Sequence, residues 1–237
     1  MKKYIIVTGG TKGIGRAVVM RFAQAGFAVV TCARSTADLL TLATDIEQAI
    51  PGSELYTLSA DLSQPDEARR FTDFVLALGG KIEVLVNNIG AFTPGRLQDD
   101  TEDGSVLRHM IEVNLYSTYD VTRALLPSML AHGGGHIFTM CSVASLRAYP
   151  SGGAYSVAKF ALLGLTKALR EELKEQSIRV TAVLPGATLT ASWEGADLPP
   201  ERFIKAEDVA EAIFGAYTLS PQAVVEELLI RPQLGDI

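Results

Sequence analysis

The sequence is poor in cysteine, histidine and basic charge, and it contains no long hydrophobic run. It has two cysteines, Cys32 and Cys141, among 237 residues. Both lie inside apolar stretches and cannot form a disulfide framework, which favours a reducing, cytoplasmic location. The 27 acidic and 21 basic side chains give a formal net charge of −6. Nucleic acids and anionic membranes bind basic surfaces, so neither is expected as a partner.

Long apolar runs are also missing. No stretch reaches the roughly 18 residues that span a bilayer. The apolar start Tyr4–Val7 ends at Thr8-Gly9-Gly10, short of the roughly 7–15 residues in the core of a signal peptide. No membrane association is therefore expected. The apolar share is nevertheless 48%, enough for a real core and too high for a disordered chain.

The three histidines do not indicate a metal site. His132 and His136 are separated by three glycines, which favour a turn over a helical zinc-binding pair. The acid that follows the first histidine of a zinc protease motif is missing, and His109 is expected on a helix surface. No metal is predicted.

Short β-branched runs alternate with amphipathic segments along the whole chain. This alternation predicts an α/β fold, a single Rossmann-like doubly wound parallel sheet of about seven strands with helices on both faces. No linker or repeat interrupts the pattern, so residues 1–237 are expected to form a single domain. The expected strands are 4–8, 27–33, 54–59, 84–86, 136–141, 179–184 and 224–230, and the expected helices are 14–25, 36–49, 65–78, 104–131, 154–175 and 206–218.

One long segment, residues 186–204, has no clear periodic pattern and contains two glycines and two prolines. A loop of this length in a compact domain is usually functional, so a substrate lid is predicted here. In open parallel sheets, ligands bind beyond the carboxyl ends of the strands. The candidate functional residues are therefore those that follow the expected strands.

A glycine-rich loop lies between the first expected strand and a helix. It reads Thr8-Gly9-Gly10-Thr11-Lys12-Gly13-Ile14-Gly15-Arg16. Glycines allow the backbone to approach a pyrophosphate, whose charge then meets the helix N-terminus. The spacing differs from the G-x-G-x-x-G fingerprint, and a P-loop would need Lys-Ser or Lys-Thr where Arg16-Ala17 stands. Nucleotide binding is predicted, and the alternative is a purely structural turn.

The end of the second expected strand indicates which dinucleotide binds. It reads Thr31-Cys32-Ala33-Arg34-Ser35, with no acid before Asp38. An NAD site usually places an acid near this point to bind the ribose 2′-hydroxyl. Arg34 can instead bind a 2′-phosphate through its planar guanidinium, and Lys12 adds a second positive charge. The two cations favour NADP(H) over NAD(H); the alternative is that both are solvated surface side chains.

A tyrosine and a lysine lie one helical turn apart in Tyr155-Ser156-Val157-Ala158-Lys159. A phenol has a pKa of about 10, and a nearby ammonium that stabilises the phenolate makes it useful for acid–base chemistry at neutral pH. Ser142, at the end of an expected strand, could donate a hydrogen bond to a substrate carbonyl oxygen. Ser156-x-x-Lys159 also fits penicillin-recognising enzymes, but their S-D-N and K-T-G motifs do not occur in the sequence.

With these motifs the chain resembles the short-chain dehydrogenase/reductase family over essentially its whole length. The resemblance implies an NADP-dependent oxidoreductase that transfers hydride from NADPH to a ketone or aldehyde. It implies that Tyr155 is the general acid in reduction and that Ser142 polarises the carbonyl. Lys159 would bind the nicotinamide ribose and lower the Tyr155 pKa. Asn114 would hold a water that links Lys159 to solvent.

The resemblance also implies a set of cofactor contacts. Asp61-Leu62 matches the family's adenine-side acid, Asn87-Asn88-Ile89-Gly90 its motif after the fourth strand, and Pro185-Gly186 with Thr190 the loop that binds the nicotinamide carboxamide. Ile89 replaces the alanine that is usual in the family. The expected contacts are Gly9, Thr11, Lys12, Gly13, Ile14, Gly15, Ala33, Arg34, Asp61, Leu62, Asn88, Gly90, Tyr155, Lys159, Pro185, Gly186, Thr188 and Thr190.

The expected substrate contacts are Ser142, Tyr155 and Trp193. Trp193, the only tryptophan, lies in the expected lid, where it could stack on a planar ring such as a pterin or anchor the lid to the domain. Together with the C-terminal run Val224–Pro232, it makes the chain similar to bacterial sepiapterin reductases within the family. The alternatives are a 3-oxoacyl-acyl-carrier-protein reductase and a non-catalytic NADP(H) sensor.

Self-association is a further implication of the resemblance. Related enzymes pair through the long helices that flank the active site, here 104–131 and 154–175. A homodimer or homotetramer that acts on a small-molecule carbonyl or alcohol is therefore expected.

Overall fold

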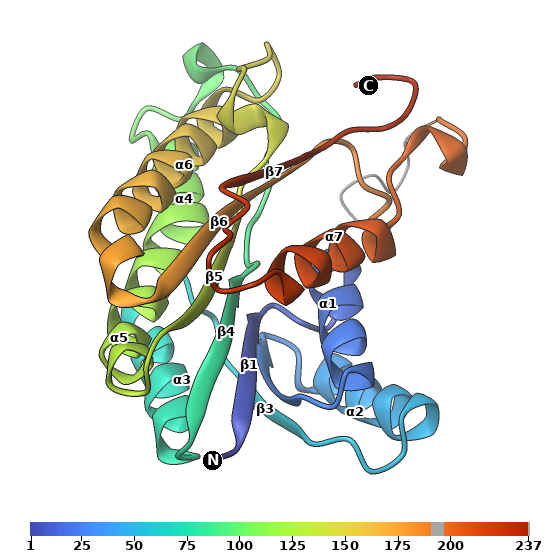
Figure 1. Ribbon diagram of the computed structural model, residues 1–237. Helices are drawn as coiled ribbons and strands as arrows, with labels where there is room; N and C mark the ends of the chain where they lie inside the picture. The colour runs from blue at the N-terminus through green and yellow to red at the C-terminus, as the bar shows by residue number, and fades with distance from the viewer. Residues whose placement is uncertain (191–196, 237) are drawn as a thin grey trace.

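The computed structural model describes residues 1–190 and 197–236. In this part of the chain, a seven-stranded sheet with the order β3-β2-β1-β4-β5-β6-β7 forms the centre of the molecule (Figure 1). All pairs of neighbouring strands are parallel. The strands are β1 (Lys3–Thr8), β2 (Ala28–Ala33), β3 (Leu55–Ser59), β4 (Lys81–Asn87), β5 (Gly135–Met140), β6 (Ile178–Pro185) and β7 (Glu227–Ile230).

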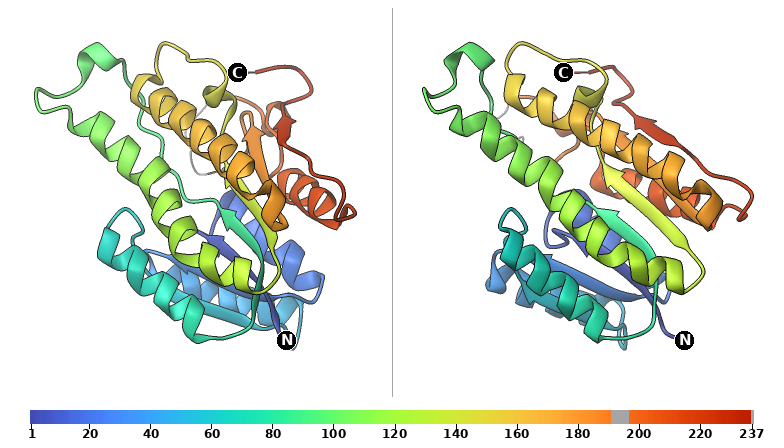
Figure 2. Two further views of the ribbon diagram at one scale, coloured as in Figure 1. Left: turned by 60° about the vertical axis from the view of Figure 1, so that its left-hand side comes forward. Right: turned by 90° about the vertical axis from the view of Figure 1, so that its left-hand side faces the viewer.

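Helices cover both faces of the sheet, which confirms the predicted doubly wound, Rossmann-like fold (Figures 1 and 2). The strand order reverses between β1 and β4, and ligands of this architecture bind at the carboxyl ends of the strands beside such a point. On one face lie α1 (Gly13–Gln24), α2 (Thr36–Ala49) and α7 (Ala206–Thr218), and on the other lie α3 (Pro65–Ala77), α4 (Ser105–Ile111), α5 (Ser117–Ala131) and α6 (Gly153–Leu173).

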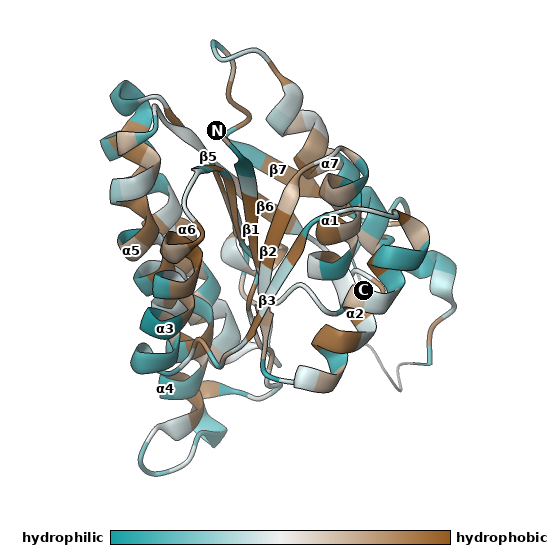
Figure 3. Ribbon diagram, turned by 90° about the horizontal axis from the view of Figure 1, so that it is seen from below, coloured by the Kyte–Doolittle hydropathy of each residue, from teal (hydrophilic) through white to brown (hydrophobic). Residues whose placement is uncertain are grey.

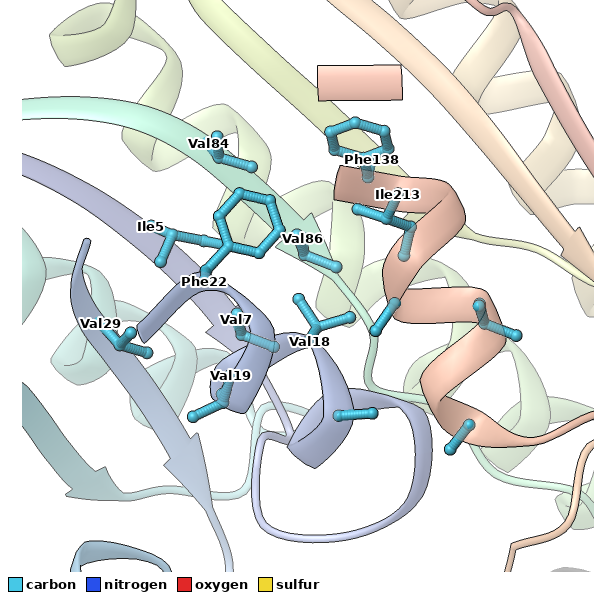
Figure 4. Packing of buried hydrophobic residues seen from close by; sticks show 14 of the residues in the cluster. Ile5, Val7, Val18, Val19, Phe22, Val29, Val84, Val86, Phe138 and Ile213 are labelled. Atoms are coloured by element: carbon cyan, nitrogen blue, oxygen red, sulfur yellow. The ribbon is translucent and has the colours of Figure 1, made fainter. Parts of the chain in front are cut away.

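The strands are apolar on both faces because both faces are covered. Ile5 and Val7 of β1 pack with Phe22 of α1 and Ile213 of α7 on one side of the sheet (Figure 4). Ile6, the residue between them, points to the opposite side, into a second cluster with residues of α3 and α5. Figure 3 shows the resulting pattern, hydrophobic strands between helices with hydrophilic outer surfaces. Burial of these side chains supplies the main favourable free energy of folding.

The segment predicted as one helix over 104–131 is helical from Ser105 to Ala131 and contains a π-helical turn. It consists of α4, a π-helical turn at Glu112–Tyr116, and α5. Asn114 lies in the π-helical turn, and its side-chain amide bonds outside the helix, as described below. Hydrophobic periodicity does not report such a long-range bond, so the sequence could not indicate the π-helical turn. Short 3-10 turns occur at Leu97–Asp99, Val143–Ser145, Lys174–Gln176 and Pro200–Arg202.

The predicted lid is described only in part. Residues 191–196 of the predicted range 186–204 lie outside the described residues. On either side of them, Thr188 pairs with Ile204 in an isolated parallel bridge. Among the described helices, none has both the length and the apolarity to cross a membrane.

His136 is a fully buried polar side chain near the start of β5. Its Nε2 lies 2.7 Å from the hydroxyl of Thr181, which itself donates to the Val225 carbonyl. The ring stacks on Phe138, with centroids 3.9 Å apart. Burial lowers the His136 pKa to about 3, and the nearby Arg179 acts in the same direction. The folded chain therefore keeps this imidazole neutral.

The buried His136 predicts that the protein loses stability in acid. Between about pH 6.5 and about pH 3, the unfolded chain binds a proton at this position that the folded chain does not. Stability is present above pH 6.5 and is lost as the pH falls, by roughly 2 kcal/mol between pH 7 and pH 5. Urea unfolding of wild type and His136→Gln at both pH values should show a smaller loss in the variant. Equal losses would contradict this prediction.

Candidate active site

The candidate cofactor contacts gather at one edge of the sheet, because the carboxyl ends of parallel strands all point the same way. Those after β1 are Gly9, Thr11, Lys12, Gly13, Ile14 and Gly15; those after or at the end of β2 are Ala33 and Arg34; those after β3 are Asp61 and Leu62; those after β4 are Asn88 and Gly90; and those at or after the end of β6 are Pro185, Gly186, Thr188 and Thr190.

The glycine loop fits the backbone approach that a pyrophosphate requires. Gly9 and Gly13 have φ values of 70° and 52°, in the left-handed region that favours glycine. A Cβ on Gly15 would lie 2.2 Å from the Gly9 carbonyl oxygen, so no other residue fits there without a backbone shift. Lys12, the N-cap of α1, makes no side-chain cap bond to the first turn. The first amides of α1 therefore remain suited to an anionic group.

The segment after β4 is fastened to this loop. The side-chain amide of Asn88 donates to the carbonyls of Thr8 and Gly9 at 2.9 and 3.0 Å. The Thr8 hydroxyl accepts from the backbone amides of Asn88 and Ile89 at 2.9 and 3.1 Å. Ile89 packs against the loop, since a Cβ on Gly9 would lie 2.9 Å from its Cγ1. The larger residue at this family position thus fills space beside Gly9.

The two cations expected to contact a 2′-phosphate follow β1 and β2. Arg34 is exposed directly after β2. Lys12 reaches the first turn of α2, where its Nζ forms an ion pair with Asp38 at 2.8 Å. Ser35 caps α2 by accepting from the Asp38 amide at 3.1 Å. The pairing of Lys12 with Asp38 was not indicated by the sequence, because the two residues meet only through the packing of the loop against α2.

At the expected adenine contact, the Asp61 carboxylate accepts bonds from the amide and hydroxyl of Ser63, at 3.1 and 2.8 Å. Leu62 is buried. On the other side of the site, Gly186 donates to the Ile230 carbonyl at 2.8 Å. Thr190 lies against the glycine loop, since a Cβ on Gly13 would lie 3.0 Å from its Cγ2. The loop after β6 and the glycine loop therefore adjoin. Trp193, the expected substrate contact, lies outside the described residues.

Ser142, Tyr155 and Lys159 are brought together where β5 ends and α6 begins. Ser142 follows β5, and its hydroxyl accepts from the Ala144 amide at 3.1 Å. Tyr155 lies in the first turn of α6, and the Ser142 hydroxyl is near enough to lower its pKa. Lys159 is 3% exposed, and its Nζ lies 5.6 Å from the centre of the Tyr155 ring. The ammonium donates to the Met140 carbonyl at 2.8 Å, which fixes its position.

The protonation of these groups follows from their burial. Burial raises the pKa of Tyr155, while the Ser142 hydroxyl acts in the opposite direction. The net shift of the Tyr155 pKa is upward. This is opposite to the resemblance, which implies that Lys159 lowers the Tyr155 pKa. Burial lowers the Lys159 pKa to about 8. In this environment the Tyr155 phenol keeps its proton at neutral pH, as a proton donor must.

Asn114 joins the segment after β4 to the helices. Its Nδ2 donates to the Ala91 and Met110 carbonyls, both at 3.0 Å, and its Oδ1 accepts from the Ala91 amide at 3.2 Å. A Cβ on Gly90 would lie 2.8 Å from the Asn114 Oδ1 and 3.3 Å from the Lys159 Nζ. Gly90 therefore allows Asn114 and Lys159 to approach the same stretch of backbone.

A doubly wound sheet, a pyrophosphate-type glycine loop and a Ser-Tyr-Lys group at one sheet edge define the class of dinucleotide-dependent oxidoreductases. Residues 3–198 match the family model described as short chain dehydrogenase, and the chain belongs to this family. The family prediction made from the sequence is thereby confirmed.

Individual relatives are similar over nearly their full length. The chain is 34% identical to the sepiapterin reductase of Chlorobaculum tepidum, covering 100% of this chain and 99% of that one. It resembles an alcohol dehydrogenase from the archaeon Thermococcus sibiricus complexed with 5-hydroxy-NADP. The TM-score is 0.88 and the identity is 30%, over 98% of this chain and 97% of that one. A 7α-hydroxysteroid dehydrogenase complexed with NADH and 7-oxo glycochenodeoxycholic acid has a TM-score of 0.88, 27% identity, and coverage of 99% and 94%. Complexes with NADP or NADPH are among the similar structures.

Gly15 provides a test of the loop geometry. Gly15→Ala should weaken NADPH binding at least tenfold, because the new Cβ must displace the Gly9 carbonyl, and should cost about 1–3 kcal/mol of stability. Gly215→Ala in α7 is the matched control, since a Cβ there meets nothing within 4 Å. It should leave NADPH affinity unchanged and stabilise the fold by roughly 0.5–1 kcal/mol. Fluorescence titration and urea unfolding measure both effects, and wild-type affinity in Gly15→Ala would refute the loop assignment.

Proposed function

We propose that the protein is an NADPH-dependent carbonyl reductase that transfers hydride to a ketone or aldehyde. The observation that carries this proposal is the group of Ser142, Tyr155 and the buried Lys159 at the same sheet edge as the glycine loop. A non-catalytic NADP(H) sensor would have no use for a buried lysine that is held beside a partly buried tyrosine. Burying an ammonium is costly, and such groups are common at reaction centres.

Each residue has a distinct role in this proposal. The Ser142 and Tyr155 hydroxyls bind the substrate carbonyl oxygen, and Tyr155 donates the proton as the alkoxide forms. Lys159, whose pKa is about 8, stabilises the resulting phenolate and binds the nicotinamide ribose. Asn114 keeps the segment after β4 beside Lys159 and holds a water that links Lys159 to solvent. The bound cofactor supplies the hydride.

Removal of the Tyr155 hydroxyl tests this chemistry. Tyr155→Phe should reduce kcat by about 10²–10⁴-fold, because the proton donor is lost while the ring and its packing remain. Tyr119→Phe removes a hydroxyl from an exposed ring on α5 and should retain wild-type turnover. NADPH consumption with a panel of ketones and aldehydes is the measurement. Equal turnover by Tyr155→Phe and wild type, or no turnover of any carbonyl by wild type, would rule out the proposed mechanism.

The preference for NADP(H) over NAD(H) is proposed from charge. Solved members of the family bind either cofactor, so the argument depends on Lys12 and Arg34 in this chain. The exposed Arg34 guanidinium after β2 suits a phosphate, whereas the neighbouring Asp38 carboxylate competes with that phosphate for Lys12.

Two substitutions of opposite effect test the charge argument. Arg34→Asp should weaken NADPH binding by roughly 10–100-fold and change NADH binding little, because only NADPH carries the 2′-phosphate. Asp38→Asn should strengthen NADPH binding by up to about fivefold, because Lys12 is released from an exposed ion pair. Dissociation constants for both cofactors provide the readout. An equal loss for NADPH and NADH in Arg34→Asp would exclude the 2′-phosphate assignment.

For the substrate, we propose a carbonyl on a pterin side chain, as in sepiapterin. The similarity to the Chlorobaculum tepidum sepiapterin reductase at 34% identity supports this substrate. The alternative within the enzyme class is a 3-oxoacyl-acyl-carrier-protein reductase. Comparing sepiapterin with a 3-oxoacyl thioester distinguishes them, and a strong preference for the thioester would overturn the pterin assignment. Stacking of Trp193 on the pterin, within a lid over 186–204, belongs to the same proposal.

We also propose that the chain acts as one domain in a homodimer or homotetramer in the cytoplasm. Four large apolar or aromatic side chains on the outer sides of the π-helical turn, α5 and α6 are 41–47% exposed, namely Tyr116, Tyr119, Val157 and Phe160. An exposed group of this kind favours association with a second copy. The two unpaired, buried cysteines support a reducing compartment.

A further inference from the structure

Two partly exposed aromatic rings lie near the start of α6, and both belong to well-anchored loops. Phe92, in the loop after β4, is 39% exposed, and Tyr149, in the loop after β5, is 37% exposed. The Phe92 and Tyr155 rings meet at 84°, with centroids 5.1 Å apart. Edge-to-face pairs of this kind are favourable. Phe92 thus contacts the proposed proton donor while part of its surface stays open.

The loop that carries Phe92 is fixed on both sides of this residue. On one side, Asn114 bonds the amide and carbonyl of Ala91. On the other, the Gly95 amide donates to the Ser151 carbonyl at 2.8 Å, and the Gly95 carbonyl accepts from the Gly153 amide at 3.0 Å. These two Gly95 bonds join the loop after β4 to the loop after β5, and both loops lie at the upper end of the molecule in Figure 2. Phe92 is therefore preorganised.

Tyr149 is positioned from the opposite loop. Its ring lies against Gly152, where a Cβ would be 2.4 Å from the Tyr149 Cε2. The Gly152 amide donates to the Tyr149 carbonyl at 3.1 Å, which closes the turn. Burial raises the pKa of Tyr149 to about 12, and Tyr155 adds to this shift, as expected for two neighbouring phenols. Glycine at 152 therefore lets this ring pack flat beside the start of α6.

Rings that are fixed and partly exposed bind ligands at little cost in conformational entropy. Scattered surface apolar groups need no explanation, but here one ring contacts the proposed proton donor and a second lies beside the start of the helix that carries it. Stacking and edge contacts between aromatic rings contribute about 0.5–1.5 kcal/mol each, or roughly a 2- to 12-fold change in affinity. An alicyclic group of the same size would not gain this contribution.

We propose that Phe92 and Tyr149 form an aromatic wall that selects substrates whose carbonyl is attached to, or lies next to, a flat conjugated ring. This inference rests on the proposed reductase function, because the wall adjoins the phenol that would protonate the carbonyl. It places ring recognition on two described residues of the loops after β4 and β5. The proposed selection applies to any carbonyl compound with a flat conjugated ring, whether or not the ring is a pterin.

Acetophenone and cyclohexyl methyl ketone form a matched pair of probes, since they share size and the methyl carbonyl but differ in ring planarity. For each protein, the ratio of kcat/KM for the two ketones is measured, so that their intrinsic reactivities cancel between variants. Dissociation constants of the same ketones for the NADPH complex are measured in parallel. Phe92→Leu and Tyr149→Leu should each lower the aromatic preference by roughly 2- to 12-fold in both measurements. Tyr149→Phe, which keeps the ring, should retain it.

Leu40→Ala, at an exposed leucine on α2, controls for nonspecific effects and should leave both ratios unchanged. Unchanged aromatic preference in both Phe92→Leu and Tyr149→Leu, with folding intact, would overturn the aromatic wall. Loss of turnover in Tyr155→Phe would still support the reductase. If wild type turns over neither ketone, the dissociation constants alone decide the wall, and the carbonyl panel described above still decides the reductase proposal. Equal affinity of wild type for both ketones would then reject it.

Discussion

Four hydrogen bonds between the glycine loop and the segment after β4 hold together the place where the strand order reverses. They involve only Thr8, Gly9, Asn88 and Ile89, and they join two strands that are distant in the sequence. Asn114 extends the connection to Ala91, and Gly90 brings the same backbone beside Lys159. A dinucleotide bound at the loop and a substrate bound at Tyr155 would therefore share one hydrogen-bonded framework.

The buried Lys159 lies against this framework at Gly90. An ammonium removed from water needs hydrogen-bond acceptors to offset the loss of hydration. Its contact with the Met140 carbonyl supplies one at the end of β5. The same burial that lowers the Lys159 pKa raises that of Tyr155, so both groups are nearer to neutrality than they would be in water.

The strand–helix alternation and the motifs after each strand are local patterns. They were enough to predict the sheet and to name Ser142, Tyr155 and Lys159 as candidates at one edge of it. Contacts between segments far apart in the sequence were not predictable. The bond from Asn114 to Ala91 lies where a single helix was expected, and the Lys12–Asp38 pair depends on how the loop meets α2. The Phe92 contact with Tyr155 likewise requires two separate loops to meet. The roles assigned to the site residues, and the lid with Trp193, remain predictions.

The paired bonds of Gly95 with Ser151 and Gly153 also have a consequence for protein engineering. They make the loops after β4 and β5 a single structural unit, although Gly95 and Ser151 are more than 50 residues apart in the sequence. A graft that takes one of these loops from a homologue would leave unmatched hydrogen-bonding groups on the other. Chimeras within this family should therefore exchange both loops as a unit, with their glycines included.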